Sequence, residues 1–158
     1  MSGLNPASLR IVAFCCHYCA YAAADLAGVL RLRYPAEPRI VELPCTGRID
    51  LLEVLHAFEH GADGVMVAGC LEGDCHFRTG NLNARRRVAR IQNWLARIGI
   101  EPERIEMVSM SSAMGRQFAE AATDLTQRIQ ALGPSPLRRE AKLAPLAATT
   151  QGVQEIET

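Results

Sequence analysis

Four short apolar runs alternate along the chain with longer segments in which apolar residues recur every three or four positions. The runs cover about residues 10–14, 39–43, 64–68 and 104–108. Continuous apolar runs of this length are typical of strands that are buried on both faces of a parallel sheet. The longer segments have the period of a helix with one buried face. The pattern therefore predicts four repeats of a strand followed by a helix.

The ends of the predicted helices are marked by local signals. The first covers about 20–33 and stops before Pro35, because the residue before a proline avoids helical geometry. Asp50 and Glu53 have the spacing of a capping box at the start of the second. Gly99 ends the third. The fourth is the most regular, and its apolar positions are Phe118, Ala122, Leu125, Ile129 and Leu132.

The alternation predicts the fold class. Linkers this short favour right-handed crossovers between parallel strands. We therefore expect a single α/β domain over residues 10–133, with a four-stranded parallel sheet flanked by helices, Rossmann-like or flavodoxin-like in outline. From Pro134 the sequence turns to Pro, Ala, Gln and Thr without a period. Residues 134–158 are predicted to be a flexible tail, disordered or bound to a partner.

Length and charge narrow the class of protein. The 158 residues suit one domain with a real core. Seventeen basic and seventeen acidic residues balance, so no overall field favours nucleic acid or an anionic membrane. No segment approaches the roughly 20 apolar residues needed to span a bilayer, and the first ten residues lack the apolar run of a signal peptide. We expect a cytoplasmic protein that does not span a membrane.

Six cysteines are grouped at the ends of the first three predicted strands. In a reducing cytosol, clustered cysteines more often bind metal or carry out redox chemistry than form disulfides. Because the carboxyl ends of parallel strands lie at one edge of a sheet, the three groups should meet there. The first group is Cys15, Cys16 and Cys19, the second is Cys45 alone, and the third is Cys70 with Cys75.

The spacing of these cysteines favours an iron–sulfur cluster. Such clusters are held by four thiolates from short loops, and a Cys-x2-Cys pair such as Cys16 and Cys19 supplies two. Gly69 and Gly73 let the third loop bend close to a cluster and offer N–H groups to sulfur. Cys15 is interpreted as a small buried apolar residue. These features predict a one-electron carrier.

Two other chemistries compete with the cluster. Structural zinc also takes four cysteines, although its ligands usually come as two pairs in one short stretch. A thiol–disulfide site at Cys16 and Cys19 would use the start of a helix to lower a thiol pKa. That interpretation leaves Cys70 and Cys75 unexplained. The alternative function is therefore a thiol-redox or zinc-stabilised interaction module.

Other polar residues give weaker signals. His17 and His76 each adjoin a cysteine and are candidates to bind iron or donate a hydrogen bond to a cluster, or simply face solvent. His56 and His60 are four apart on a helix without a third ligand, and we interpret them as surface residues. Neither a dinucleotide-binding glycine motif nor a nucleophile–base–acid set is present, so we expect no substrate chemistry from the chain alone. Four arginines form a basic face that could dock an acidic redox partner, and they are Arg85, Arg86, Arg87 and Arg90.

Several motifs, in order and with their spacing, resemble the delta subunit of methyl-viologen-reducing hydrogenase. They are Phe-Cys-Cys-His-Tyr-Cys at 14–19, Asp-Leu-Ala-Gly at 25–28, Cys-Thr-Gly-Arg-Ile-Asp at 45–50, Gly-Cys-Leu-Glu-Gly-Asp-Cys-His at 69–76 and Gly-Asn at 80–81. The resemblance covers about residues 10–133. Members of the family often carry Pro-Gly where this chain has Glu72-Gly73, a change that leaves the cysteines in place.

The resemblance implies a cofactor, a ligand set and partners. The cofactor is a 2Fe–2S cluster, and the family pattern maps onto Cys16, Cys19, Cys45, Cys70 and Cys75, one more cysteine than a cluster needs. Which of the five is spare stays open. The implied role is an electron bridge that is not itself catalytic. It would run from a hydrogenase, a formate dehydrogenase or a related donor to a flavin-bearing, heterodisulfide-reductase-like subunit.

Overall fold

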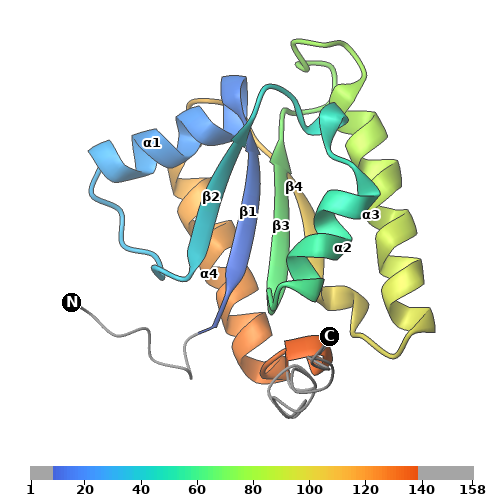
Figure 1. Ribbon diagram of the computed structural model, residues 1–158. Helices are drawn as coiled ribbons and strands as arrows, with labels where there is room; N and C mark the ends of the chain where they lie inside the picture. The colour runs from blue at the N-terminus through green and yellow to red at the C-terminus, as the bar shows by residue number, and fades with distance from the viewer. Residues whose placement is uncertain (1–8, 139–158) are drawn as a thin grey trace, which may run out of the picture.

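A computed structural model describes residues 9–138 and contains a four-stranded parallel sheet (Figure 1). Its strands are β1 (Ile11–Cys16), β2 (Pro38–Leu43), β3 (Gly64–Gly69) and β4 (Ile105–Ser109). The order across the sheet is β2-β1-β3-β4, and every neighbouring pair is parallel. The predicted fold class is confirmed, and this order matches the flavodoxin-like rather than the Rossmann arrangement.

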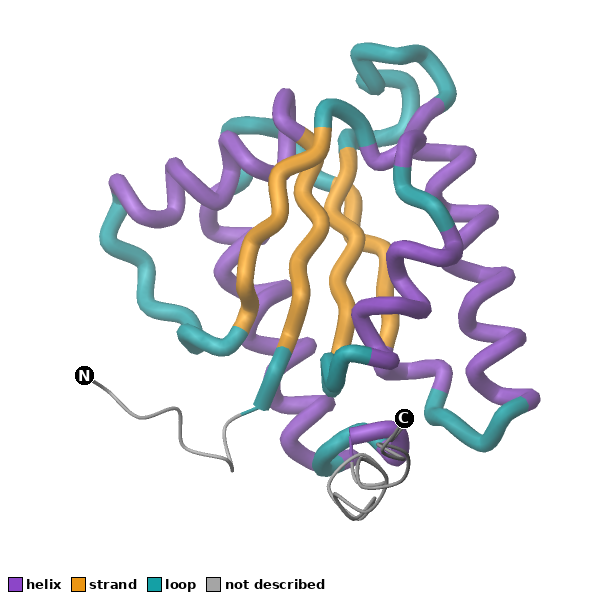
Figure 2. Tube along the Cα trace, in the orientation of Figure 1, coloured by secondary structure: helices purple, strands orange, loops and turns teal. Residues whose placement is uncertain are grey.

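Helices cover both faces of the sheet. In Figures 1 and 2, α1 and α4 lie on one face and α2 and α3 on the other. The helices are α1 (Ala22–Val29), α2 (Leu51–Glu59), α3 (Gly80–Arg97) and α4 (Gly115–Leu132), with a π-helical turn at His17–Tyr21 and 3-10 turns at Thr46–Arg48 and Pro102–Arg104. Among the residues described, no helix has both the length and the apolar character needed to cross a membrane.

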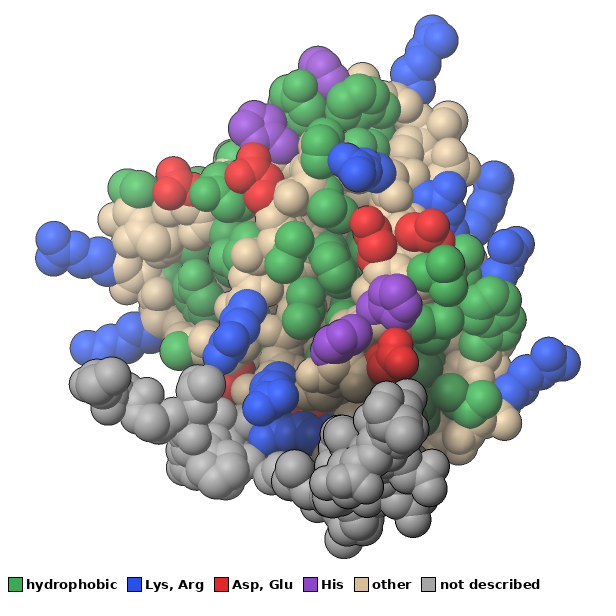
Figure 3. Space-filling view, in the orientation of Figure 1, with side chains coloured by type: hydrophobic (Ala, Val, Ile, Leu, Met, Phe, Trp, Pro, Cys, Tyr) green, Lys and Arg blue, Asp and Glu red, His purple; other side chains and the backbone are tan. Residues whose placement is uncertain are grey.

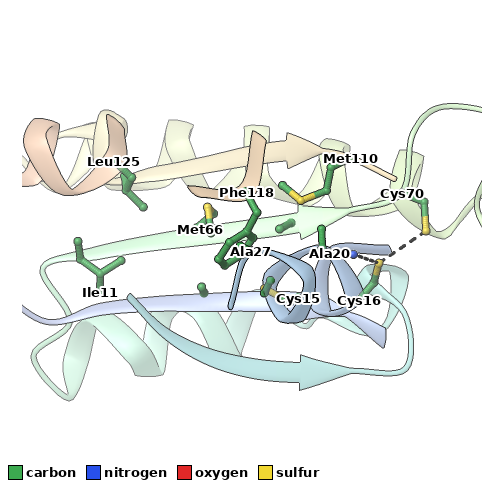
Figure 4. Close-up of a cluster of buried hydrophobic side chains, with 14 of the residues drawn as sticks. Ile11, Cys15, Cys16, Ala20, Ala27, Met66, Cys70, Met110, Phe118 and Leu125 are labelled. Carbon is green, nitrogen blue, oxygen red and sulfur yellow. Dashed lines mark hydrogen bonds between the residues drawn. The ribbon is translucent and has the colours of Figure 1, made fainter. Parts of the chain in front are cut away.

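The sheet separates two hydrophobic cores, which explains the continuous apolar runs. Alternate residues of β1 point to opposite faces. Cys15 packs with Met66 and Phe118 under α1 and α4, in the core drawn in Figure 4. Phe14 and Val67 pack with the residues of α2 and α3 on the other face. All six residues of β3 are buried, because this strand has a neighbour on each side and a helical layer on each face.

The first helix is shorter than its sequence predicts. The expected boundaries were about 20–33, but α1 ends at Val29. Arg31 adopts a left-handed backbone conformation with φ of 53°, and Leu32 N–H donates to Ala27 O at 2.9 Å. This turn ends the helix before the chain reaches Pro35, so the proline does not set the boundary. The prediction of the C-terminal boundary was therefore wrong by four residues.

The first residues of the predicted tail pack against the domain. Ser135 N–H donates to Asp63 Oδ1 at 2.8 Å, and Arg138 forms an ion pair with the same carboxylate. Arg10 N–H donates to Asp63 Oδ2 at 2.9 Å. Asp63, Ser135 and Arg138 are all buried. Residues 134–138 therefore contact the amino-terminal edge of the sheet, and residues 139–158 lie outside the described part of the chain.

Candidate metal centre

Two cysteines meet where the sheet order reverses. Cys16 is the last residue of β1, and Cys70 directly follows β3, its neighbour in the sheet. Both side chains are buried, and their Sγ atoms are 3.6 Å apart (Figure 4). Ligands of open α/β sheets bind at this kind of switch point, beyond the carboxyl ends of the strands. The fold thus brings two thiols together at the expected edge.

Cys19 completes a group of three sulfurs. It lies in the π-helical turn that follows β1. The Sγ atoms of Cys16, Cys19 and Cys70 all lie within 4.8 Å of one another. Ala20 N–H donates to Cys16 Sγ at 3.4 Å, so the start of this helical segment already points a backbone donor at sulfur. Three converging thiols form a soft donor set of the kind that zinc and iron–sulfur clusters use.

Cys45 and Cys75 form a second pair beside this group. Their Sγ atoms are 3.9 Å apart, and Gly47 N–H donates to Cys45 Sγ at 3.3 Å. Burial chiefly raises the pKa of Cys45, and the charges of Cys75 and Cys16 raise it further. Cys16 therefore acts electrostatically on both sulfur groups. All five predicted site cysteines come together at one edge of the sheet.

The thiols of this edge differ in how readily they ionise. Burial raises the pKa of Cys70 and of Cys19. Burial also acts against ionisation of Cys75, but backbone N–H groups of Asn81, Phe77 and Gly80 outweigh it, so the pKa of Cys75 is lowered. A metal ion deprotonates the thiols that bind it, because its charge replaces the protons. Three of the thiols, those of Cys19, Cys45 and Cys70, therefore resist ionising on their own, which fits a site that a metal or cluster would complete.

Cys15 is not part of the group of three sulfurs. Its side chain is fully buried in the core under α1 and α4. Burial, followed by the neighbouring Cys16, raises its pKa to about 12. The structure therefore places Cys15 as a small apolar core residue, in agreement with the interpretation from sequence.

The histidines do not join the sulfur group. His17 Nδ1 pairs with the Glu42 carboxylate at the surface. The ring of His76 stacks on that of Tyr18, with centroids 4.0 Å apart and planes 17° from parallel. His56, on α2, and His60, which caps its C-terminal end, are both exposed, as predicted. Neither His17 nor His76 is placed as a ligand.

An exposed aromatic surface lies beside the cysteines and was missed by the sequence analysis. Tyr18 and Phe77 are 45% and 52% exposed, with His76 between them in contact with both rings. Hydrophobic and histidine side chains gather at this end of the molecule in Figure 3. The signal was available, since Tyr18 lies between two cysteines and His76-Phe77 follows a third. Tyr18 and the His76-Phe77 pair are far apart in the sequence, and only the fold brings them together.

The arginine face of α3 is not uniform. Arg87 Nη1 donates to Gly47 O at 2.6 Å and to Ile49 O at 2.8 Å. Arg87 is therefore engaged within the domain, and its hydrogen bonds hold the loop that follows β2. Arg85 forms an exposed ion pair with Glu72 at 3.4 Å. A docking role for the exposed arginines Arg85, Arg86 and Arg90 stays a prediction.

Comparison with known proteins gives close relatives of one kind. The chain is 48% identical over 130 residues to the vhu iron-sulfur subunit of the F420-non-reducing hydrogenase of Methanocaldococcus jannaschii, and the match covers 82% of this chain and 97% of that one. It is 43% identical over 129 residues to the vhc iron-sulfur subunit of the F420-non-reducing hydrogenase of Methanococcus voltae, with 82% and 90% covered.

A larger protein contains a related stretch. The chain is 36% identical over 148 residues to one subunit of the ferredoxin:CoB-CoM heterodisulfide reductase of Methanosarcina mazei, covering 92% of this chain but 18% of that protein. The family model described as methyl-viologen-reducing hydrogenase, delta subunit, matches residues 11–133, which is nearly the whole described domain. The chain therefore belongs to the methyl-viologen-reducing hydrogenase delta subunit family.

Proposed function

We propose that this chain is an electron-transfer subunit that holds one 2Fe–2S cluster at the carboxyl edge of its sheet. The observation that carries the proposal is the convergence of five thiols from three loops, with a group of three within 4.8 Å and an adjoining pair 3.9 Å apart. Four of Cys16, Cys19, Cys45, Cys70 and Cys75 would hold the cluster. Such a cluster accepts and releases one electron at a time.

The protein's own groups would set how the cluster behaves. Backbone N–H groups reach Cys16, Cys45 and Cys75. Hydrogen bonds to cluster sulfurs stabilise the extra negative charge of the reduced state, and burial of the thiols limits access of water. These donors therefore support a site that cycles between two charge states.

The relatives support the proposed partners. Proteins named as iron-sulfur subunits of F420-non-reducing hydrogenases match this chain over most of their length. In the heterodisulfide reductase relative, a stretch similar to this chain is part of one longer polypeptide. Because the two are joined there, we infer that a separate chain such as this one binds a heterodisulfide-reductase-like protein. We propose a flavin-bearing, heterodisulfide-reductase-like acceptor in the cytoplasm. The donor would be a hydrogenase, a formate dehydrogenase or a related enzyme.

The second candidate function is a thiol-redox or zinc-stabilised interaction module. The group of Cys16, Cys19 and Cys70, with one further cysteine, would also satisfy tetrahedral zinc. The closely spaced thiols could instead form reversible disulfides. Acid-labile sulfide separates the candidates, because neither zinc nor a dithiol contains it.

The deciding experiment is elemental analysis of anaerobically purified full-length chain, with EPR after reduction. About two irons and two sulfides per chain, with a reduced 2Fe–2S signal, are expected from the proposal. Stoichiometric zinc without sulfide, or a titratable dithiol with neither, would refute the electron-bridge function and support the second candidate.

A further inference from the structure

Helix α3 starts in direct contact with two of the site cysteines. A Cβ atom added at Gly80 would lie 2.3 Å from Cys45 Sγ and 3.3 Å from Cys75 Sγ. Conversely, a Cβ atom added at Gly47 would lie 2.5 Å from the Cα atom of Gly80. Ordinary contacts between such atoms are about 3.5–4.0 Å. The absence of a side chain at Gly80 therefore allows the Cys45 loop and the Cys75 loop to approach each other.

Two further side chains of α3 fasten the same loops. The buried Asn81 donates through Nδ2 to Cys70 O at 3.1 Å and to Leu71 O at 2.8 Å. Arg87, two helical turns after Gly80 and so on the same side of the helix, holds two carbonyls of the Cys45 loop, those of Gly47 and Ile49. One short stretch of helix thus binds the loop of the second strand and the loop of the third.

We propose that Gly80, Asn81 and Arg87 form a brace that sets the separation of Cys45 and Cys75 and keeps both sulfurs within reach of the cluster. The three are positioning residues, and none supplies a ligand atom. The Cys16–Cys70 contact does not depend on the brace in the same way, because adjacent strands β1 and β3 fix it. The proposal rests on the proposed cluster function for its purpose, but the separation can be tested without a cluster.

The test compares two thiol pairs in the same metal-free, full-length chain. Dibromobimane links thiols that lie close together, and trypsin then separates the linked pairs. Cys45 is in peptide 40–48, Cys16 is in peptide 11–31, and Cys70 and Cys75 are in peptide 49–78. The yield of the 40–48/49–78 product relative to the 11–31/49–78 product reports the Cys45 separation against an internal reference.

The variants are Gly80→Ala and Arg87→Gln, each with a matched control. Gly28→Ala adds a methyl group to helix α1 where no atom lies within 4 Å, and Arg86→Gln removes an exposed arginine next to Arg87. In Gly80→Ala the Cys45 sulfur must retreat by about 1 Å to restore ordinary contact. Because misplacements of about 1 Å can slow reactions between positioned groups by up to about 100-fold, we expect the yield ratio to fall at least about threefold.

Three outcomes decide the proposal. A fall in the ratio for Gly80→Ala and Arg87→Gln, but not for the controls, supports the brace. An unchanged ratio, or an equal loss of both products, overturns it, because the helix would then support only the fold in general. If Gly80→Ala does not fold, Arg87→Gln decides alone.

A second readout separates this inference from the proposed function. Iron, sulfide and the reduced EPR spectrum are measured on the same variants purified anaerobically. A wild-type chain without sulfide would refute the cluster and leave the crosslinking result standing. The brace alone would be refuted if the wild-type chain holds a cluster and both brace variants show the same iron and sulfide content and the same EPR spectrum.

Discussion

Cys15 and Cys16 are neighbours in sequence, and both pack in the core cluster under α1 and α4. Cys16 is the last residue of β1, and its Sγ atom lies 3.6 Å from that of Cys70, whereas Cys15 is not part of the group of three sulfurs at the sheet edge. Burial alone does not distinguish them, because both are buried. Their different positions decide their different roles.

Substituting these cysteines should separate ligands from core residues. Cys16→Ser or Cys70→Ser is expected to remove most of the iron and sulfide, because each removes a sulfur from the group of three. Cys15→Ala should keep both at the wild-type level and cost about 1 kcal/mol of unfolding free energy. Iron and sulfide assays with urea denaturation check this. Loss of the cluster in Cys15→Ala at unchanged stability would contradict the assignment.

In the metal-free chain, the thiol of Cys75 should react with an alkylating reagent before that of Cys15. The pKa of Cys75 is lowered, so its thiolate is present at a lower pH than that of an ordinary cysteine. The pKa of Cys15 is raised to about 12, so this thiol stays protonated throughout the neutral range. Because the thiolate is the nucleophile, Cys75 should be alkylated by iodoacetamide before Cys15 between about pH 7 and 9. Mass spectrometry of timed samples measures the order, and equal rates would refute it.

At the scale of elements, the start of β3 joins three distant segments. Asp63 accepts hydrogen bonds from Arg10 N–H and Ser135 N–H and pairs with Arg138. Arg104, fully buried before β4, donates to Asp63 O at 3.0 Å and to Gly133 O at 2.9 Å. This network lies at the opposite end of the strands from the cysteines. It stabilises the sheet without taking part in the site.

Asp63→Ala should destabilise the domain and leave its metal chemistry intact. The substitution removes one partner of a buried ion pair and the acceptor of two backbone N–H groups, at a cost of about 3–5 kcal/mol. Urea denaturation gives the unfolding free energy. The exposed Asp124 on α4 provides the control, since Asp124→Ala should change it by less than about 0.5 kcal/mol. A cost below about 1 kcal/mol for Asp63→Ala would show that the network is dispensable.

Local sequence signals predicted the start of helix α2 but not the start of helix α3. Asp50 accepts from Leu52 N–H at 3.2 Å, and Glu53 accepts from Asp50 N–H at 3.0 Å, so the predicted capping box is confirmed. Helix α3 begins at Gly80, eight residues before Val88, the first large apolar side chain that it buries. Its first turn, with Gly80 and Asn81, contacts the cysteine loops. Hydrophobic periodicity could not detect that part of the helix.

At the scale of the whole molecule, the cysteine edge coincides with an exposed aromatic surface. Tyr18 and Phe77 belong to two different cysteine loops and flank His76. Exposed aromatic clusters are characteristic of protein interfaces, where a few such residues carry most of the binding energy. A partner bound here would bring its own redox centre close to the proposed cluster.

The double substitution Tyr18→Ser, Phe77→Ser should therefore weaken transfer but not the cluster. We expect electron transfer to a purified heterodisulfide-reductase-like flavoprotein to slow at least about tenfold at limiting partner concentration, the effect of losing about 1.4 kcal/mol of binding. Stopped-flow reduction measures the rate, and EPR confirms the cluster. Trp94→Ser, a change at a 40% exposed aromatic on α3, is the control. Equal rates in the double variant and the wild type would place docking elsewhere.

By itself, the sequence determined the strands, most of the helices and the edge at which the cysteines meet. These follow from local periodicity and from the shared direction of parallel strands, so they need no knowledge of distant contacts. The spacing of the cysteines also carried the expectation of a soft metal site, because short loops after neighbouring strands can present several sulfurs at once.

Only the tertiary structure decided how the pieces meet. The order β2-β1-β3-β4 places Cys16 beside Cys70, and no periodicity in one segment encodes which strand will be its neighbour. The close approach of Gly47 and Gly80 and the burial of Ser135 and Arg138 likewise join positions far apart in the chain. Such contacts depend on side-chain packing and hydrogen bonds between elements that are already folded, and local sequence patterns report neither.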